Sequence, residues 1–401
     1  MKNIVMFGLK YDENIGDPVI VDCMEYFSNK IVSNVSNKNI EIVSADMSGR
    51  TEFILTRSLT QKIIDKLLRV FIPNQKRKIE INNARKGALN AVLSNINNET
   101  LAIVFAGGGL IKYKQQLCHH YIDVITEYAD KHNIPVMISG AGVEGYDELN
   151  RECQMLKRAL RRSCVKVITT RDDLSLLTEF YCENTNIRTA QVADPACSIN
   201  SIYPEFYKKK PSNYLNKNKM CIGIGVGRSN LFADYGINIS EQQLLTFYKE
   251  LVHELENKGY DWKIFTNGLN YDQRFAEKIV SYLGKSECDN VLIKKPSNIE
   301  ELLEIINNFD ATIVCRLHAS IISYSYDIPT LGLVWNNKQK MFGESIGHPE
   351  RFLDMKNLSA KTVVNIMENA ITQGYNKADK EKYCDTTFEL LKEFFVKHII
   401  T

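Results

Sequence analysis

The sequence contains no long hydrophobic run, no strong net charge and no closely spaced pair of cysteines. No stretch approaches the roughly 20 apolar residues that a membrane-spanning helix needs, and the apolar run at the N-terminus is too short for a secretory signal. The formal net charge is +2, so nucleic acid is not an expected partner and any anion site must be local. The 10 cysteines are scattered without a C-x-x-C pair, which is typical of a reducing compartment. We therefore expect a cytoplasmic protein.

Nucleotide fingerprints are missing as well. Gly107-Gly108-Gly109 follows an apolar run, but it is not a G-x-G-x-x-G motif and no Walker lysine comes after it. Cys118-His119-His120 is a weak metal candidate, because adjacent residues of a helix point in different directions. We predict no metal site and no bound cofactor.

The apolar pattern alternates between strand-like runs and helix-length amphipathic segments, which predicts parallel α/β units. Strands of a first sheet are predicted at residues 2–8, 40–46, 101–109, 134–142, 166–172 and 188–196. Strands of a second sheet are predicted at residues 220–227, 261–268, 290–295, 311–318 and 329–335, with helices over 240–259 and 270–284. The pattern indicates two doubly wound domains, at 1–202 and 220–372, joined by a basic, polar linker at 203–219. A C-terminal helix over 377–401 should pack back on the body.

The pattern over residues 50–94 predicts a basic, amphipathic and helical insertion in the first domain. Two interpretations stay open. In the first, the charged face of the insertion is simply solvated. In the second, the insertion touches an acidic partner or the inner face of a membrane.

Four groups of residues stand where strands end, and ligands of open α/β sheets bind at the carboxyl ends of strands. Asn14 and Asp17 follow the first strand, and Asp17 either caps a helix beginning at Pro18 or binds a ligand. The glycines at 107–109 should let backbone amides approach an anion where a helix begins at Leu110. Arg171 ends the strand over 166–172, where a guanidinium either grips a carboxylate or phosphate or pairs with Asp172.

The fourth group is Arg316, His318 and Lys338. Arg316 and His318 alternate onto one face if the strand is still extended there, and Lys338 follows the next strand. An arginine beside a histidine provides a cation that can bind an anionic group and a proton donor in one place. We favour function over a purely structural histidine here.

The ordered blocks ENIGD, AGGGL, Gly140–Val143, ITTRDDLS, ADPA, GIGVG and CRLHASIISYSYDIPTLGLVWNNK resemble the polysaccharide pyruvyl transferase family. The resemblance implies two Rossmann-like domains facing each other across a cleft, similar to the two-domain GT-B glycosyltransferase architecture. It implies phosphoenolpyruvate as donor and a sugar hydroxyl pair as acceptor, carried on a lipid or a nucleotide. The product would be a cyclic pyruvate ketal of an exopolysaccharide, with phosphate released.

On this resemblance His318 is the expected acid, and Asp17 and Asn14 are expected to hold or deprotonate the sugar hydroxyls. Arg171, Arg316 and Lys338 would bind the donor, and Gly107, Gly108, Gly109 and Gly142 would line the substrate site. Two alternatives remain: a nucleotide-sugar-dependent glycosyltransferase of similar architecture, and a non-catalytic protein that binds a sugar or an anion.

Overall fold

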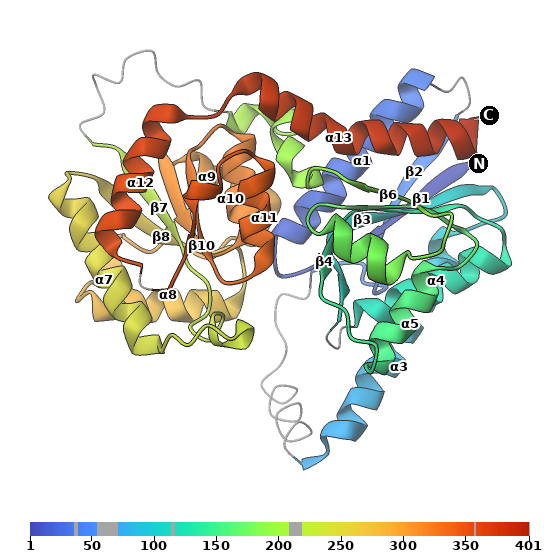
Figure 1. Cartoon of the computed structure of the whole chain (residues 1–401), viewed down its shortest axis with the longest axis horizontal. Coiled ribbons are helices and arrows are strands. Elements are labelled where there is room, and N and C mark those ends of the chain that lie inside the picture. The colour runs from blue at the N-terminus through green and yellow to red at the C-terminus, as the bar shows by residue number, and fades with distance from the viewer. Residues whose placement is uncertain (36–38, 54–70, 114–116, 208–218, 357, 401) are drawn as a thin grey trace. The chain divides into compact units, whose positions relative to one another are not determined.

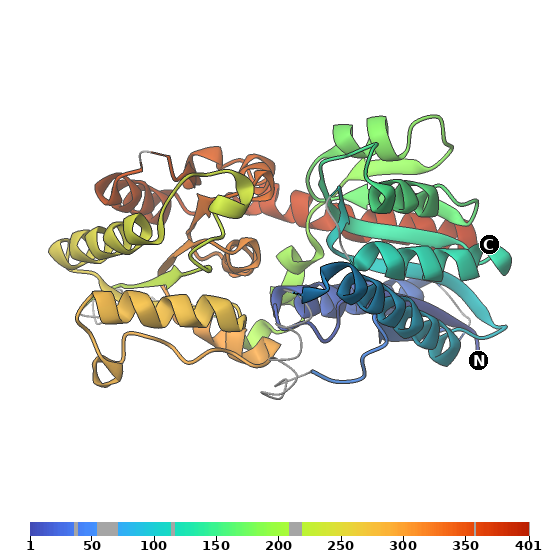
Figure 2. The same cartoon turned by 90° about the horizontal axis from the view of Figure 1, so that it is seen from below.

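The chain folds into two parallel-sheet α/β units. The computed structural model describes residues 1–35, 39–53, 71–113, 117–207, 219–356 and 358–400 (Figures 1 and 2). Residues 1–13, 20–195 and 385–401 belong to the first unit, and residues 14–19 and 196–384 belong to the second. The short segment 14–19 therefore belongs to a different unit from the residues that directly precede it in the chain.

The first sheet has six parallel strands in the order β2-β1-β3-β4-β5-β6, and all six coincide with predicted strands. They are β1 (Asn3–Gly8), β2 (Glu41–Asp46), β3 (Thr100–Lys112), β4 (Val136–Glu144), β5 (Val165–Thr170) and β6 (Arg188–Gln191). The chain runs outward from β1 to β2 and returns to the other side of β1 with β3. Such a switch in strand order is where open α/β sheets bind ligands.

Helices cover both faces of this sheet. On one face lie α3 (Pro73–Asn95), α4 (Cys118–Lys131) and α5 (Arg151–Leu160), which share a buried core with Phe7 and Phe105. On the other face α1 (Gly16–Val35) packs through Ser28, whose hydroxyl lies 3.1 Å from the sulfur of Met6. The C-terminal helix α13 (Lys377–Phe395) joins α1 through an edge-to-face contact of Phe27 with Phe388.

The second sheet has five parallel strands in the order β11-β10-β9-β7-β8. They are β7 (Cys221–Gly225), β8 (Asp261–Phe265), β9 (Ala311–Val314), β10 (Thr330–Val334) and β11 (Phe352–Asp354). The predicted strand at 290–295 is wrong, because this stretch makes only one bridge, from Leu292 to Ile264 beside the edge strand β8, before Pro296 follows. The short strand β11 was not predicted.

The helices of the second unit are α7 (Glu241–Asn257), α8 (Asn270–Tyr282), α9 (Ile299–Asn307), α10 (Leu317–Ser325), α11 (Asn337–Ser345) and α12 (Ala360–Gln373). Ser240 forms a capping box with Gln243 at the start of α7, and Gly259 follows its end at φ +80°, as the sequence predicts. Apolar residues of α7, α8 and α12 share one core with β7, β9 and β10. Helix α10 lies against the other face, where the Thr312 and Ser323 hydroxyls are 3.0 Å apart.

The chain crosses from the first unit to the second between Pro195 and Ala196, before the predicted linker at 203–219. A 3-10 turn over Pro195–Ser201 already bonds to the second unit, where the Asn200 amide donates to the Ser325 hydroxyl at 3.1 Å. Residues 208–218 of the predicted linker lie outside the described residues.

The described part of the insertion at 50–94 is largely the helix α3, and residues 54–70 lie outside the described residues. Helix α3 packs through small side chains, including Ala84, Ala88 and Ala91. In the described part of the chain, no helix has the length and apolar character required to cross a bilayer.

Candidate active site

Arg316 and His318 stand where β9 passes directly into α10. Arg316 has an extended backbone at the cap position, and the helix begins at Leu317. His318 therefore lies in the first turn of a helix and not on an extended strand, so the condition for the two side chains to alternate onto one face of a strand is not met. The imidazole is 7% exposed. A helix N-terminus at the carboxyl edge of a sheet attracts negative charge, which suits an anionic substrate.

The segment Asn14–Asp17 lies on the second unit, at the carboxyl end of β8. The Ile15 amide donates to the Asn267 carbonyl at 3.2 Å. Helix α1 begins at Gly16, so Asp17 lies inside its first turn instead of capping a helix that starts at Pro18. The Asp17 carboxylate accepts a hydrogen bond from the Asn14 side-chain amide at 2.8 Å. The two residues predicted to handle sugar hydroxyls are thus coupled to each other.

Gly16 brings this segment against His318. A Cβ atom built on Gly16 would lie 2.1 Å from Nδ1, 2.2 Å from Cγ and 2.4 Å from Cβ of His318. Only a residue without a side chain allows this approach. Residues some 300 positions apart in the sequence, the Asn14–Asp17 segment and His318, therefore form one corner within one unit.

Arg316 is held by a carboxylate that sequence reasoning missed. Its Nε and Nη2 donate to Oδ2 and Oδ1 of Asp272 at 2.8 and 2.7 Å, and Asp272 is fully buried. The Arg228 amide adds a third bond to the same carboxylate at 2.9 Å. This fork fixes the plane of the guanidinium and uses two of its five N–H donors, leaving three for a ligand.

Lys338 lies in the first turn of α11, after β10, the strand that pairs with β9. Two side chains tie these neighbouring strand ends together. The Trp335 indole and the Gln339 amide both donate to the Cys315 carbonyl, at 2.6 and 2.9 Å. The structure therefore places Lys338 and Arg316 at the ends of adjacent strands, at one edge of the second sheet.

Arg171 belongs to the first unit, just beyond β5. Its guanidinium pairs with Asp194, and both side chains are buried. The neighbouring Asp172 does not pair with it; instead its Oδ1 accepts from the Val143 amide at 2.6 Å and from the Thr170 hydroxyl at 2.9 Å. Asp194 is the aspartate of the ADPA block, so this partner of Arg171 belongs to one of the sequence blocks already singled out.

The glycine triplet does not precede a helix, so the prediction that Gly107–Gly109 opens a helix at Leu110 is wrong. Strand β3 runs through all three glycines to Lys112, because it stays paired with β4 from Gly108 opposite Ala141 to Lys112 opposite Glu144. Gly107 has φ +29° and Gly108 φ +83°, and the pairing of β3 with β4 shifts its register between Gly108 and Ile111. Gly142 lies within β4 and is buried.

The histidines at 119 and 120 are buried on α4. Burial lowers the pKa of His119 to about 4, and burial also lowers the pKa of His120. Among the described residues, no three His, Cys, Asp or Glu side chains are grouped to hold a metal ion.

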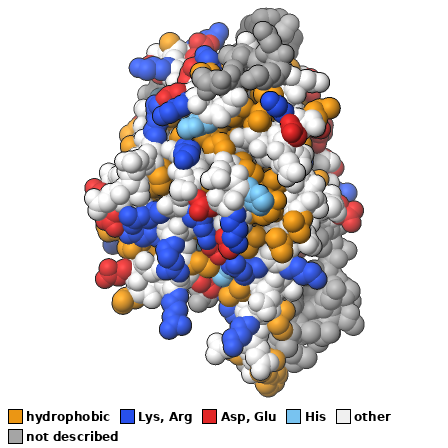
Figure 3. All heavy atoms as spheres, turned by 90° about the vertical axis from the view of Figure 1, so that its right-hand side faces the viewer, with side chains coloured by type: hydrophobic (Ala, Val, Ile, Leu, Met, Phe, Trp, Pro, Cys, Tyr) orange, Lys and Arg blue, Asp and Glu red, His pale blue; other side chains and the backbone are white. Residues whose placement is uncertain are grey.

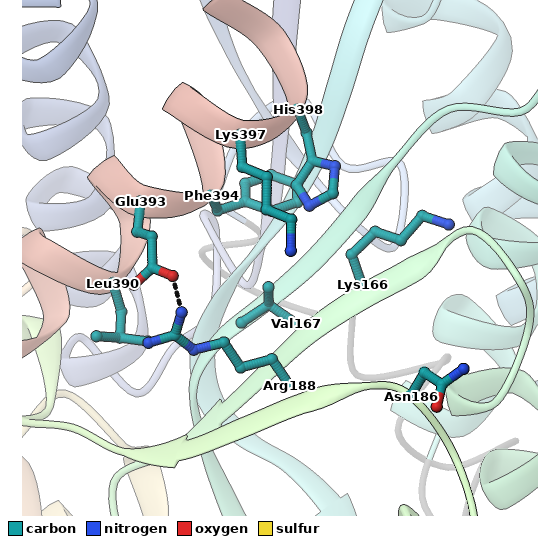
Figure 4. Close-up of a pocket in the computed structure, with 9 residues that line it drawn as sticks. All are labelled: Lys166, Val167, Asn186, Arg188, Leu390, Glu393, Phe394, Lys397 and His398. Carbon is teal, nitrogen blue, oxygen red and sulfur yellow. Dashed lines mark ion pairs between the residues drawn. The ribbon is translucent and has the colours of Figure 1, made fainter. Parts of the chain in front are cut away.

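A pocket of the first unit lies at the opposite ends of the strands. Lys166 and Arg188 stand at the starts of β5 and β6, and Figure 4 shows them with the last turns of the chain, where Arg188 pairs with Glu393. Figure 3 shows many Lys and Arg side chains on the face toward the chain termini. None of the predicted site residues lines this pocket. Since strand starts are not where such sheets bind substrates, we do not assign it to the reaction.

Comparison with protein families settles the assignment of the chain. A sequence model of the family described as polysaccharide pyruvyl transferase matches residues 14–337. The chain belongs to this family. Membership in the polysaccharide pyruvyl transferases makes it a transferase with a role in pyruvyl transfer in polysaccharide biosynthesis. No curated protein matches the sequence.

Solved structures support the two-domain fold of this pyruvyl transferase family member. They include the UDP-GlcNAc 2-epimerase of Neisseria meningitidis, with 11% identity, coverage of 99% of this chain and 100% of that chain, and a TM-score of 0.55. The UDP-GlcNAc 2-epimerase of Methanocaldococcus jannaschii has 10% identity, the same coverages and a TM-score of 0.55. The α,α-trehalose 6-phosphate synthase of Burkholderia multivorans has 10% identity, coverages of 99% and 95%, and a TM-score of 0.54. At such identities the likeness concerns the fold alone, two Rossmann-like domains of GT-B type.

Proposed function

We propose that the chain transfers the pyruvyl group of phosphoenolpyruvate to two hydroxyls of one sugar, forming a cyclic ketal and releasing phosphate. The observation that carries the proposal is the corner formed by His318, Gly16 and the coupled pair Asn14 and Asp17. It combines a proton donor, a carboxylate and a helix N-terminus at the edge where open α/β sheets bind ligands. Family membership supports the pyruvyl transfer itself.

The reaction needs two proton movements, and this corner offers a group for each. Protonation of the methylene carbon of phosphoenolpyruvate gives a methyl group and an electron-poor carbon that the first hydroxyl attacks. The bond to the phosphate oxygen then breaks, and the second hydroxyl closes the ketal. Of the two hydroxyl protons, one replaces the proton given to the methylene carbon and one leaves with phosphate. We assign the donation at carbon to His318, and the removal of a hydroxyl proton to Asp17.

The donor is a small anion, and cations at the edge of the second sheet suit it. Arg316, oriented by Asp272, and Lys338 on the next strand end are assigned to its carboxylate and phosphate. The N-terminus of α10 adds backbone N–H groups for the same charge. Arg171, Gly107–Gly109 and Gly142 belong to the first unit, and their contacts with substrate stay predictions, as does membrane contact through 50–94.

A product assay tests the proposal. The chain is incubated with phosphoenolpyruvate and a panel of lipid-linked and nucleotide-linked sugars, and released phosphate is measured beside the mass of the sugar product. The proposal predicts one phosphate for each pyruvyl group gained. Release of a nucleoside diphosphate from a sugar nucleotide, without consumption of phosphoenolpyruvate, would instead identify a glycosyltransferase.

A further inference from the structure

Asn267 is a buried amide whose hydrogen bonds the fold does not supply. The residue is 1% exposed, and within the part of the chain that the structure describes neither Oδ1 nor Nδ2 has a hydrogen-bond partner. The observation is the same if the positions of Oδ1 and Nδ2 are exchanged, because both atoms lack a hydrogen-bond partner. Buried polar groups are nearly always satisfied, so an amide left in this state calls for an explanation.

The surroundings of Asn267 are otherwise well satisfied. The hydroxyl of the preceding Thr266 donates to Gln273 at 3.0 Å, and the Asn267 backbone carbonyl accepts from the Ile15 amide at 3.2 Å. Elsewhere in the same unit the buried Asn307 donates through Nδ2 to the Leu303 carbonyl at 2.9 Å. Asn307 thus finds a partner within its own helix, whereas both polar atoms of the Asn267 side chain lack one.

Asn267 also lies at the edge that carries the proposed chemistry. It follows the edge strand β8, which ends at Phe265 and pairs with β7. The Ile15 amide donates to the Asn267 carbonyl, and the next residue, Gly16, packs against His318. Two adjacent residues of the Asn14–Asp17 segment thus contact the Asn267 backbone and the His318 side chain.

The chemistry of an amide restricts the ligand class. Asn267 presents an acceptor oxygen and two donor N–H groups. A carboxylate or phosphate has only acceptors and would leave Oδ1 without a partner, whereas a hydroxyl both donates and accepts. We infer that the Asn267 side chain binds hydroxyl groups of the sugar acceptor and so helps to select it. This inference rests on the proposed function.

The experiment compares Asn267→Leu with the matched control Asn307→Leu, using the full chain throughout. Leucine has nearly the shape of asparagine, so replacing an unsatisfied amide should leave thermal stability unchanged or raise it, whereas Asn307→Leu should lower the melting temperature. Sugar binding is measured by saturation-transfer NMR with the methyl glycosides of glucose, galactose and mannose. Donor binding is measured by calorimetry with phosphoenolpyruvate.

We expect Asn267→Leu to weaken binding of the preferred glycoside by about tenfold or more, with unchanged affinity for phosphoenolpyruvate. A lower melting temperature with unchanged glycoside binding would show that Asn267 is structural, and absence of glycoside binding by the wild-type chain would also overturn the inference. If the wild-type chain binds a glycoside through Asn267 but releases no phosphate from phosphoenolpyruvate with any acceptor, the proposed function fails and the sugar site stands.

Discussion

Replacing Gly16 with alanine tests whether the corner around His318 is built for catalysis. The added methyl group would lie 2.1 Å from Nδ1 and 2.4 Å from Cβ of His318. Ordinary contacts between such atoms begin near 3.5 Å, so the added methyl group and the Cβ of His318 must separate by about 1.1 Å, that is 3.5 minus 2.4 Å. Rotation of the imidazole cannot relieve the overlap, because His318 Cβ is fixed by the backbone of α10. Either the Asn14–Asp17 segment or the helix end must therefore move.

A displacement of about 1 Å at reacting groups can lower a rate about 100-fold, and we expect a loss of that size in turnover per folded molecule. Gly332→Ala is the matched control, because its methyl group would meet Phe352 at 2.4 Å in the core of the same unit. That variant should lose stability and keep its turnover. Steady-state rates and thermal unfolding are measured on both variants.

A double-mutant cycle separates positioning from general damage. If Gly16→Ala acts through His318, it should have little further effect on turnover in a His318→Gln background. Fully additive losses would refute the argument, as would a Gly16→Ala enzyme with normal turnover.

Further predictions concern charge and protonation. Arg316→Ala should destabilise the fold by about 3–5 kcal/mol in urea unfolding, because it leaves the buried Asp272 carboxylate uncompensated; a change below 1 kcal/mol would show that the pair is not needed for folding. His318→Gln should keep the melting temperature and lower turnover by about 10²–10⁴, whereas reduced stability with a near-normal rate would mean that another group is the acid. His119 has a folded pKa of about 4, below its usual 6.5, so the unfolded chain binds the proton more readily and stability falls as the pH drops from 6.5 towards 4. This loss should reach about 2 kcal/mol at pH 5 relative to pH 7, and a His119→Phe variant should lack it. Activity should survive EDTA, and a strict need for a divalent metal would favour a metal-dependent glycosyltransferase.

The fold could largely be predicted from the sequence, because buried parallel strands read as apolar runs separated by amphipathic helices. All six strands of the first sheet and four of the second, β7–β10, were predicted. The failures have local causes. Residues 290–295 are apolar enough for a strand but lie beyond an edge strand, and β11 is only three residues long. The glycines at 107–109 resembled a strand-to-helix turn, but β3 continues through them because β4 offers it a partner.

The candidate site was only partly predictable. His318, Asp17 and Asn14 were identified as candidates, but their proximity depends on a segment that leaves the first unit and packs on the second. No local pattern signals that Asp272, on the predicted helix at 270–284, would hold Arg316. Asn267 also went unnoticed, because an asparagine at a strand end is ordinary in sequence and only its burial without partners distinguishes it.

The most direct test of the central claim measures phosphate release from phosphoenolpyruvate, with the acceptor panel, by the wild-type chain and by His318→Gln. The account predicts acceptor-dependent phosphate release with a matching mass gain on the sugar, and a loss of at least about 100-fold in the variant. Nucleotide release without consumption of phosphoenolpyruvate, or equal rates for the two proteins, would contradict it.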